Sequence, residues 1–153
     1  MTLNEINAIF TDIATKHLQL NGFLIVQDFD INPQEELKYP CLAINPINAS
    51  LPKSDNGYTL FSIDYTLKVF DLVDKGLENE NDVLSDTLEI IKDVVTELNQ
   101  HPNFWELNLE IISDVNIEGL RGAYDEDVTG WQTTLTLQAP NIKKYCNLPT
   151  EAL

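Results

Sequence analysis

Residues 58–98 constrain the fold of this chain more than any other segment. Residues 58–71 alternate apolar and polar side chains, which is typical of a β-strand with one buried face. The apolar set of this strand is Phe61, Ile63, Tyr65, Leu67 and Val69. Residues 82–98 follow the period of an amphipathic helix, whose apolar stripe is Leu84, Leu88, Ile91, Val95 and Leu98. We therefore expect the helix to pack on the apolar face of the strand through Leu88, Ile91 and Val95.

The rest of the chain predicts one more helix and four more strands. Thr2 and Glu5 have the spacing of a capping box that begins the first helix, and Asn21 with Gly22 ends it. The additional strands are predicted at residues 23–31, 39–45, 107–117 and 133–139. The connections are a long loop at 46–57 that we expect to project, a polar link at 118–130, and an extended C-terminal tail at 141–153.

The resulting order of elements is α-β-β-β-α-β-β, with hairpin-like links between several strands. Two amphipathic helices suffice to cover one face of a largely antiparallel sheet, which predicts an α+β fold of the two-layer sandwich type. A length of 153 residues is typical of one domain, and the sequence has no internal repeat or low-complexity tract. We therefore expect residues 1–153 to form a single domain.

Acidic residues dominate the charge of the chain, with 25 acids, 9 bases and a net charge of −16. Binding the phosphates of nucleic acid requires clustered Lys and Arg. Arg121 is the only arginine and no such cluster is present in the sequence, so phosphate-binding contact with DNA is not expected. The acidity has two interpretations: it keeps the protein in solution, or it lines a pore through which DNA slides without being held. The sequence has neither a membrane-spanning run nor a signal-peptide pattern, so we expect no membrane partner and a cytoplasm-like compartment.

No motif in the sequence indicates catalysis, a cofactor or a metal. The acids of one link lack the regular spacing of a calcium loop, so we interpret the link as solvated; they are Asp71, Asp74, Glu78, Glu80 and Asp82. His17 and His101 lie near helix ends without ligand-like spacing and are interpreted as surface or capping groups. Cys41 and Cys146 are expected to be reduced thiols. Phosphate-binding glycine loops and nucleophile motifs are absent, so an enzyme is not expected.

The sheet face opposite the helices is the most informative predicted surface. Its acids are predicted to be Asp28, Asp30, Asp64, Glu110 and Asp114. Large apolar side chains interrupt them, among them Leu24, Phe70 and Ile112, so the face is either solvated or partly packed against another subunit. The residues predicted to contact other subunits are Pro52, Lys53, Trp131, Tyr145 and Leu148. Trp131, Phe104 and Trp105 have two interpretations, as core anchors or as subunit contacts.

Several segments together resemble the tail-terminator and head–tail connector (neck ring) proteins of tailed phages. They are the block 58–98, the first helix with Gly-Phe-Leu-Ile-Val at 22–26, Tyr-Pro-Cys-Leu-Ala-Ile-Asn-Pro at 39–46, Asp-Val-Thr-Gly-Trp at 127–131, and Tyr-Cys-Asn-Leu-Pro at 145–149. The Asn-rich, Arg-poor composition is similar to that of crAss-like phages. The resemblance covers most of the chain as element order and residue character, without a sharp motif.

The resemblance implies a non-enzymatic virion protein that is assembled in the host cytoplasm. It implies a homo-oligomeric ring, hexameric or dodecameric, that contacts other portal, neck or tail proteins and lets DNA pass as non-specific cargo. The acids of the free sheet face are then expected to line the lumen. The alternative is a small acidic cytoplasmic adaptor or inhibitor, including one that mimics DNA.

Overall fold

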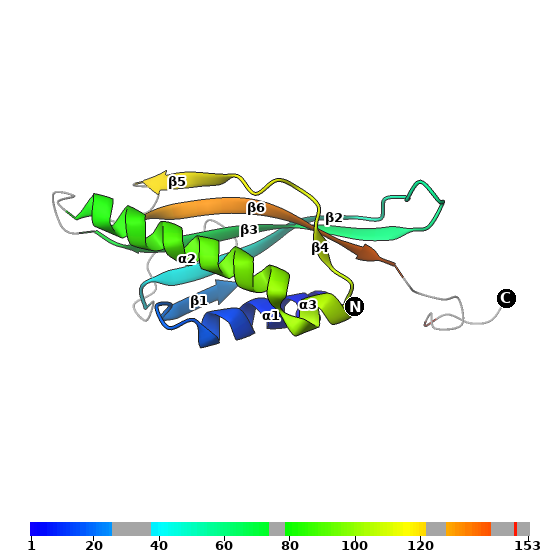
Figure 1. The fold of residues 1–153 in the computed structure, drawn as a ribbon, viewed down its shortest axis with the longest axis horizontal. Helices are drawn as coiled ribbons and strands as arrows, with labels where there is room; N and C mark the ends of the chain where they lie inside the picture. Colours follow the sequence, from blue (N-terminus) through cyan, green and yellow to red (C-terminus); the bar gives the residue numbers. More distant parts are fainter. Residues whose placement is uncertain (26–37, 74–78, 122–127, 142–148, 150–153) are drawn as a thin grey trace.

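The computed structural model describes residues 1–25, 38–73, 79–121, 128–141 and 149 (Figure 1). The helices are α1 Leu3–Lys16, α2 Glu80–Gln100 and α3 Pro102–Glu106. The strands are β1 Gly22–Ile25, β2 Cys41–Ser50, β3 Leu60–Leu72, β4 Glu110–Ile111, β5 Ile117–Arg121 and β6 Val128–Pro140. These elements form an α+β fold with a mixed, mostly antiparallel sheet, so the predicted fold class is confirmed.

β3 lies at the centre of the sheet because both of its edges are paired over long stretches. The strand order is β1-β2-β3-β6-β4, and β5 also pairs with β6. β2 and β6 run antiparallel to β3, with Leu67 opposite Ile44 on one side and Tyr65 opposite Leu135 on the other. β1 is the exception, since it runs parallel to β2. β4 and β5 are both short and share the outer edge of β6.

The predicted apolar face of β3 points into the core beneath the helices. Ile63, Tyr65, Leu67 and Val69 are at most 5% exposed, and Phe61 is half-buried at the edge of the same cluster. The predicted register is therefore confirmed. The stripe of α2 is broader than predicted, because Ile90 and Val94 are also buried while Leu88 and Val95 lie half-buried at its margin. A period of 3.6 residues places Leu88 and Val95 on one flank of the stripe that Ile91 and Val94 centre.

α1 begins as the sequence predicts. The Glu5 backbone N–H donates to Thr2 Oγ1 (3.2 Å), and the Thr2 N–H donates to a Glu5 carboxylate oxygen (2.9 Å), which completes a capping box. Ile6, Ile9 and Phe10 then turn toward the sheet, where the Phe10 ring lies 5.1 Å from that of Tyr65. The Tyr65 hydroxyl donates to Asn7 Oδ1 (2.7 Å), so the central strand is also hydrogen-bonded to α1.

Two reciprocal histidine–aspartate pairs join α1 to α2. His101, after α2, pairs through Nε2 with Asp12 of α1 (2.7 Å), and His17, after α1, pairs through Nε2 with Asp93 of α2 (3.1 Å). In each ring Nδ1 accepts a backbone N–H from two residues onward, at 3.2 Å, so the proton belongs on Nε2, where it is donated to the carboxylate. The capping role predicted for both histidines is confirmed, and the pairing between helices adds to it.

The hairpin between β2 and β3 corrects the predicted loop at 46–57. β2 continues through a bulge between Pro46 and Asn48 to Ser50, so much of that segment is paired with β3. The tip is closed by an isolated bridge between Lys53 and Thr59, and Gly57 supplies the positive φ of 83° that the turn requires. The hairpin extends beyond the helices, as expected (Figure 1).

The strand predicted at 107–117 is correct only in part, because within that range only β4 and the first residue of β5 are strand. Before it, His101 and Pro102 start α3, whose Phe104 is buried, and Asn108 adopts a left-handed conformation with φ 55°. The chain then pairs with β6 only at β4, leaves the ladder, and returns at β5. The predicted polar link at 118–130 is also corrected, because β5 reaches Arg121 and β6 begins at Val128.

Candidate functional site

The sheet face turned away from the helices carries hydroxyl, amide and carboxylate groups along its centre. We define the polar face by residues Ser62, Asp64, Thr66, Glu110, Asp114, Glu118, Gln132, Thr134, Thr136 and Gln138. Strand alternation puts these side chains opposite the core-facing set of β3 and β6. Thr134, Glu110 and Glu118 are exposed, so the face is accessible from solvent over the middle of the sheet.

The structure brings three of the predicted acids onto this face. Asp64 stands opposite Thr136 in the β3–β6 ladder and accepts a hydrogen bond from its hydroxyl at 2.8 Å. Glu110 stands opposite Gln138 across the β4–β6 pair. Asp114, between β4 and β5, lines a hollow together with Thr66 of β3. The other two predicted acids, Asp28 and Asp30, lie outside the described residues.

A fourth acid, Glu118, joins them and was missed by the sequence analysis. Its carboxylate faces Gln132 Nε2 at 3.5 Å across the β5–β6 pair. Glu118 directly follows the strand predicted at 107–117 and was assigned to the polar link at 118–130, so it was not placed on a sheet face. The signal was present nevertheless, because Val115 and Ile117 alternate with Asp114, Asn116 and Glu118.

The hollow on the polar face has a volume of about 320 Å³. It is lined by Thr66, Asp114, Asn116, Glu118, Gln132, Thr133 and Thr134. Two carboxylates and no cationic side chain contribute to this lining, so it disfavours phosphate groups. Lys68 lies on the same side of β3, but it is only 6% exposed and adds little positive surface.

One end of this sheet side is apolar, and it corrects the predicted free face. Phe70 is 1% exposed and clusters with Cys41, Ala43 and Val128. The Tyr39 ring meets Phe70 edge-on with centroids 6.0 Å apart, and half-buried Leu24 packs against the same cluster. Phe70 and Leu24 therefore pack within their own chain, whereas Ile112 remains 47% exposed. Burial raises the pKa of the Cys41 thiol to about 12, which leaves it unreactive at neutral pH.

The predicted subunit contacts have separate locations. Lys53 is exposed and Pro52 half-buried near the tip of the hairpin. Trp131 is half-buried against the core, and its Nε1–H donates to the Leu84 carbonyl at 2.8 Å, which agrees with a core anchor. Tyr145 and Leu148 lie outside the described residues.

The other two conspicuous aromatics differ from each other. Phe104 is 3% exposed and belongs to the core. Trp105 is 69% exposed, so the core-anchor interpretation is wrong for this residue. Its Nε1–H donates to the Asn99 carbonyl at 2.7 Å, which holds the ring against the end of α2.

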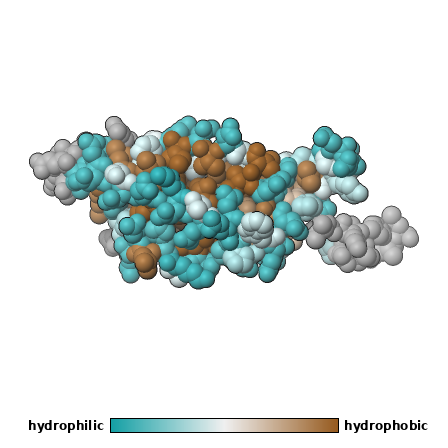
Figure 2. Space-filling view, in the orientation of Figure 1, coloured by the Kyte–Doolittle hydropathy of each residue, from teal (hydrophilic) through white to brown (hydrophobic). Residues whose placement is uncertain are grey.

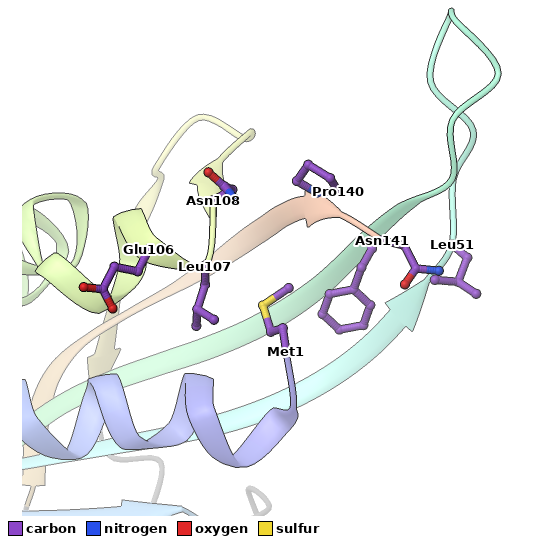
Figure 3. Close-up of a pocket in the computed structure, with 8 residues that line it drawn as sticks. Met1, Leu51, Glu106, Leu107, Asn108, Pro140 and Asn141 are labelled. Atoms are coloured by element: carbon purple, nitrogen blue, oxygen red, sulfur yellow. The ribbon is translucent and has the colours of Figure 1, made fainter. Parts of the chain in front are cut away.

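A second hollow of about 320 Å³ lies at the base of the hairpin (Figure 3). It is lined by Met1, Leu51, Phe61, Glu106, Leu107, Asn108, Pro140 and Asn141. Five of these residues are apolar, and Glu106 contributes the one side-chain carboxylate of the lining. The chain leaves β6 here, and the Asn141 N–H donates to the Thr59 carbonyl at 3.0 Å.

Within the described ranges, no three His, Cys, Asp or Glu side chains gather in a way that could hold a metal ion. In the acidic link, burial raises the pKa of Asp71, opposed by a hydrogen bond from the Leu72 N–H and assisted by the charge of Asp86. Asp74 and Glu78 lie outside the described residues. In the part of the chain that the structure describes, no helix is both long and apolar enough to cross a membrane.

Neither a known protein family nor a curated protein matches this chain in sequence.

Proposed function

We propose that this protein is a ring-forming structural subunit of the head–tail connector of a tailed phage, similar to a tail terminator, with DNA passing through the ring. In this proposal it is a non-enzymatic virion component that is assembled in the host cytoplasm and uses no cofactor. The observation that carries the proposal is the polar face, on which Asp64, Glu110, Asp114 and Glu118 lie opposite the helical layer. This face is the proposed wall of the lumen.

A lumen wall must let DNA slide past without holding it. Duplex DNA carries one negative charge per about 1.7 Å of axis, and cationic side chains that contact it release counterions and hold it. A wall of hydroxyl, amide and carboxylate groups offers no such gain, so DNA stays hydrated and free to slide. The chain's 25 acids against 9 bases support the same role, because stray cationic contacts are few.

The first test is the assembly state of the purified protein. We expect electron microscopy at high protein concentration to show annular particles, and light scattering to give the mass of a closed cyclic oligomer. The ring order, hexamer or dodecamer, follows from that mass. A protein that stays monomeric or dimeric, both alone and with portal or tail proteins, contradicts the proposal.

The second test reverses charge on the polar face. The unmodified protein should not retard DNA in a gel at physiological salt. The variant Glu110→Lys with Asp114→Lys should fold normally and bind DNA with a salt dependence of about −0.9 in log K per phosphate contacted. In a virion, this variant should slow genome exit.

The control makes the same charge change on the helical side, with Glu89→Lys and Glu97→Lys, two exposed positions of α2. If both variants bind DNA equally well in the assembled ring, the polar face is not the lumen. Retardation of DNA by the unmodified protein also contradicts the lumen proposal.

The alternative function is an acidic adaptor or inhibitor that mimics DNA. The net charge of −16 favours it, because closely spaced carboxylates can replace phosphates in a basic cleft. This alternative predicts a monomer or dimer that competes with DNA for a DNA-binding protein. Closed rings without such competition exclude it.

A further inference from the structure

The outer part of the β2–β3 hairpin is an exposed apolar projection. We define the distal hairpin as residues 46–61, in which Ile47 is 48%, Leu51 61% and Tyr58 72% exposed. Backbone hydrogen bonds from Ser54 N–H to the Tyr58 carbonyl and from Leu60 N–H to the Pro52 carbonyl, both 2.8 Å, give it a definite shape. An ordered projection with three large apolar side chains in solvent is typical of a contact element.

The distal hairpin is also nearly neutral in a strongly acidic protein. It contains one base, Lys53, and one acid, Asp55, so its formal charge is zero while the whole chain carries −16. Two copies of such a protein repel one another through most of their surfaces. A neutral projection lets one copy touch another without adding like charge to the contact.

A second apolar surface lies on the helical side of the sheet. We define the flank band as Leu88 and Val95 of α2 with Ile111, Val115 and Ile117 of the β4–β5 edge, all half-buried against the core. α2 contacts β3 and β6, and α1 lies toward β1, so the β4–β5 edge lies beside the helical layer rather than under it (Figure 1). Figure 2 shows apolar side chains gathered along this part of the surface.

The rim of the flank band on α2 lacks acids. Asp93 lies on the other flank of the helix, where it pairs with His17 of the first helix. The exposed positions next to Leu88 and Val95 at helical spacing are Ser85, Lys92 and Asn99. On the α2 side the flank band therefore borders neutral side chains and Lys92, which pairs with Glu89 at 2.9 Å. On the strand side its members alternate with the exposed acids Glu110, Asp114 and Glu118, so only an element without negative charge can approach it at low electrostatic cost.

We propose that the distal hairpin of one copy packs on the flank band of the next copy, with Leu51 and Tyr58 as the anchoring side chains. This inference rests on the proposed ring and names its subunit contact. The two surfaces are different and lie on different elements, so the contact is heterologous, and repeating it generates a ring when the rotation closes. Burial of both apolar surfaces supplies the favourable free energy, and the zero net charge of the distal hairpin avoids repulsion by the acids beside the flank band.

The test uses one variant on each surface and a matched control. The hairpin variant is Leu51→Asp with Tyr58→Asp, and the rim variant is Ser85→Glu with Lys92→Glu, all at exposed positions that leave the core intact. The control is Thr15→Glu with Lys16→Glu, the same kinds of substitution at exposed positions of α1. Circular dichroism first establishes that every variant is folded.

At a concentration where the unmodified protein forms rings, we expect light scattering to find monomers for the hairpin and rim variants and rings for the control. Mixing the hairpin variant with the rim variant should give a 1:1 dimer and no ring, because each pair retains one intact contact. Rings in both variants, or no dimer on mixing, overturn the inference while the ring function stands. An unmodified protein that never forms closed oligomers overturns the proposed function and this contact together.

Discussion

The two faces of the sheet are built from the same strands but differ in what covers them. On one face Leu67 is fully buried beneath the helices, while its neighbour Thr66 on the other face is half-buried and lines an acidic hollow. Along β6, Leu135 and Leu137 are fully buried on the helical side. Thr134, which points to the other side, is exposed. Alternation thus assigns each side chain to a face, and the helical layer decides which face becomes the core.

The side of the sheet that carries the polar face has two unlike ends. Near Phe70 and Cys41 it is apolar and buried, whereas near Asp64 and Asp114 it is acidic and open. The acidic part is the proposed lumen wall, and the apolar part is a second small core. A face can therefore be structural at one end and available for function at the other.

The largest expected effect comes from removing core volume on the helical side. Leu67→Ala or Ile91→Ala should lower the free energy of unfolding by about 2–5 kcal/mol, because each leaves a cavity at a fully buried position. Thr66→Val, on the polar face, should change it by less than about 0.5 kcal/mol. Urea denaturation measures all three, and equal losses would remove the distinction between the faces.

A smaller loss of stability is expected when a methyl group is added where two strands approach closely. A Cβ at Gly130 would lie 1.9 Å from the Val69 carbonyl oxygen, so Gly130→Ala must shift the β3–β6 pair and should cost about 1–3 kcal/mol. A Cβ at Gly119, on the adjacent strand, would meet only Trp131 Cζ3 at 3.8 Å. Gly119→Ala should therefore change the free energy of unfolding by less than about 0.5 kcal/mol. Thermal unfolding of the two variants compares the positions directly.

The two tryptophans compare the loss of one hydrogen bond at a half-buried position and at an exposed one, with a smaller expected effect on stability. Trp131→Phe removes the donor to the Leu84 carbonyl in a half-buried site and should lower the free energy of unfolding by about 1 kcal/mol. Trp105→Phe removes a similar bond at an exposed ring and should cost less, because water replaces the donor. If Trp105→Phe is the more destabilising, the exposed ring contributes packing that its accessibility does not reveal.

The smallest effect concerns the pH dependence of the helical layer. Hydrogen bonds from His101 and then Lys16 hold the pKa of Asp12 below its ordinary value of 3.8. A depressed folded-state pKa adds stability that is present above the unfolded value and is lost as the pH falls through the folded one. Asp12→Asn should therefore flatten the loss of stability between about pH 5 and pH 3.

Urea midpoints across that pH range measure the effect, with Asp55→Asn in the exposed hairpin as the control. An unchanged slope in Asp12→Asn would mean that the Asp12–His101 pair contributes nothing to the acid sensitivity of the fold.

Some features followed from local patterns alone. The capping box of Thr2 and Glu5, the alternation of β3 and the amphipathic character of α2 depend on neighbours within one or two turns or strand steps. These patterns were sufficient to predict the α+β class and the register of the central strand. They also predicted that Asp64, Glu110 and Asp114 belong to one face, because side chains along a strand alternate between the two faces of the sheet.

Other features depended on contacts between distant segments. Pairing with β3 extended β2 through Pro46, against the loop predicted from its local composition. The strand predicted at 107–117 is divided between β4 and the start of β5, and the left-handed Asn108 lies just before β4. The reciprocal pairs of His17 with Asp93 and His101 with Asp12 join residues far apart in sequence, so no local spacing reveals them.

The local sequence was enough to predict which side chains alternate and where α1 begins. Which apolar residues remain at the surface follows from the packing of distant elements, because exposure depends on what the helices reach. Leu51 and Tyr58 are exposed, Phe70 is covered on the face opposite the helices, and Val115 lies at the margin of the core. The physical reason is that burial is a non-local property, set by packing across the whole sheet rather than by the period of any one strand.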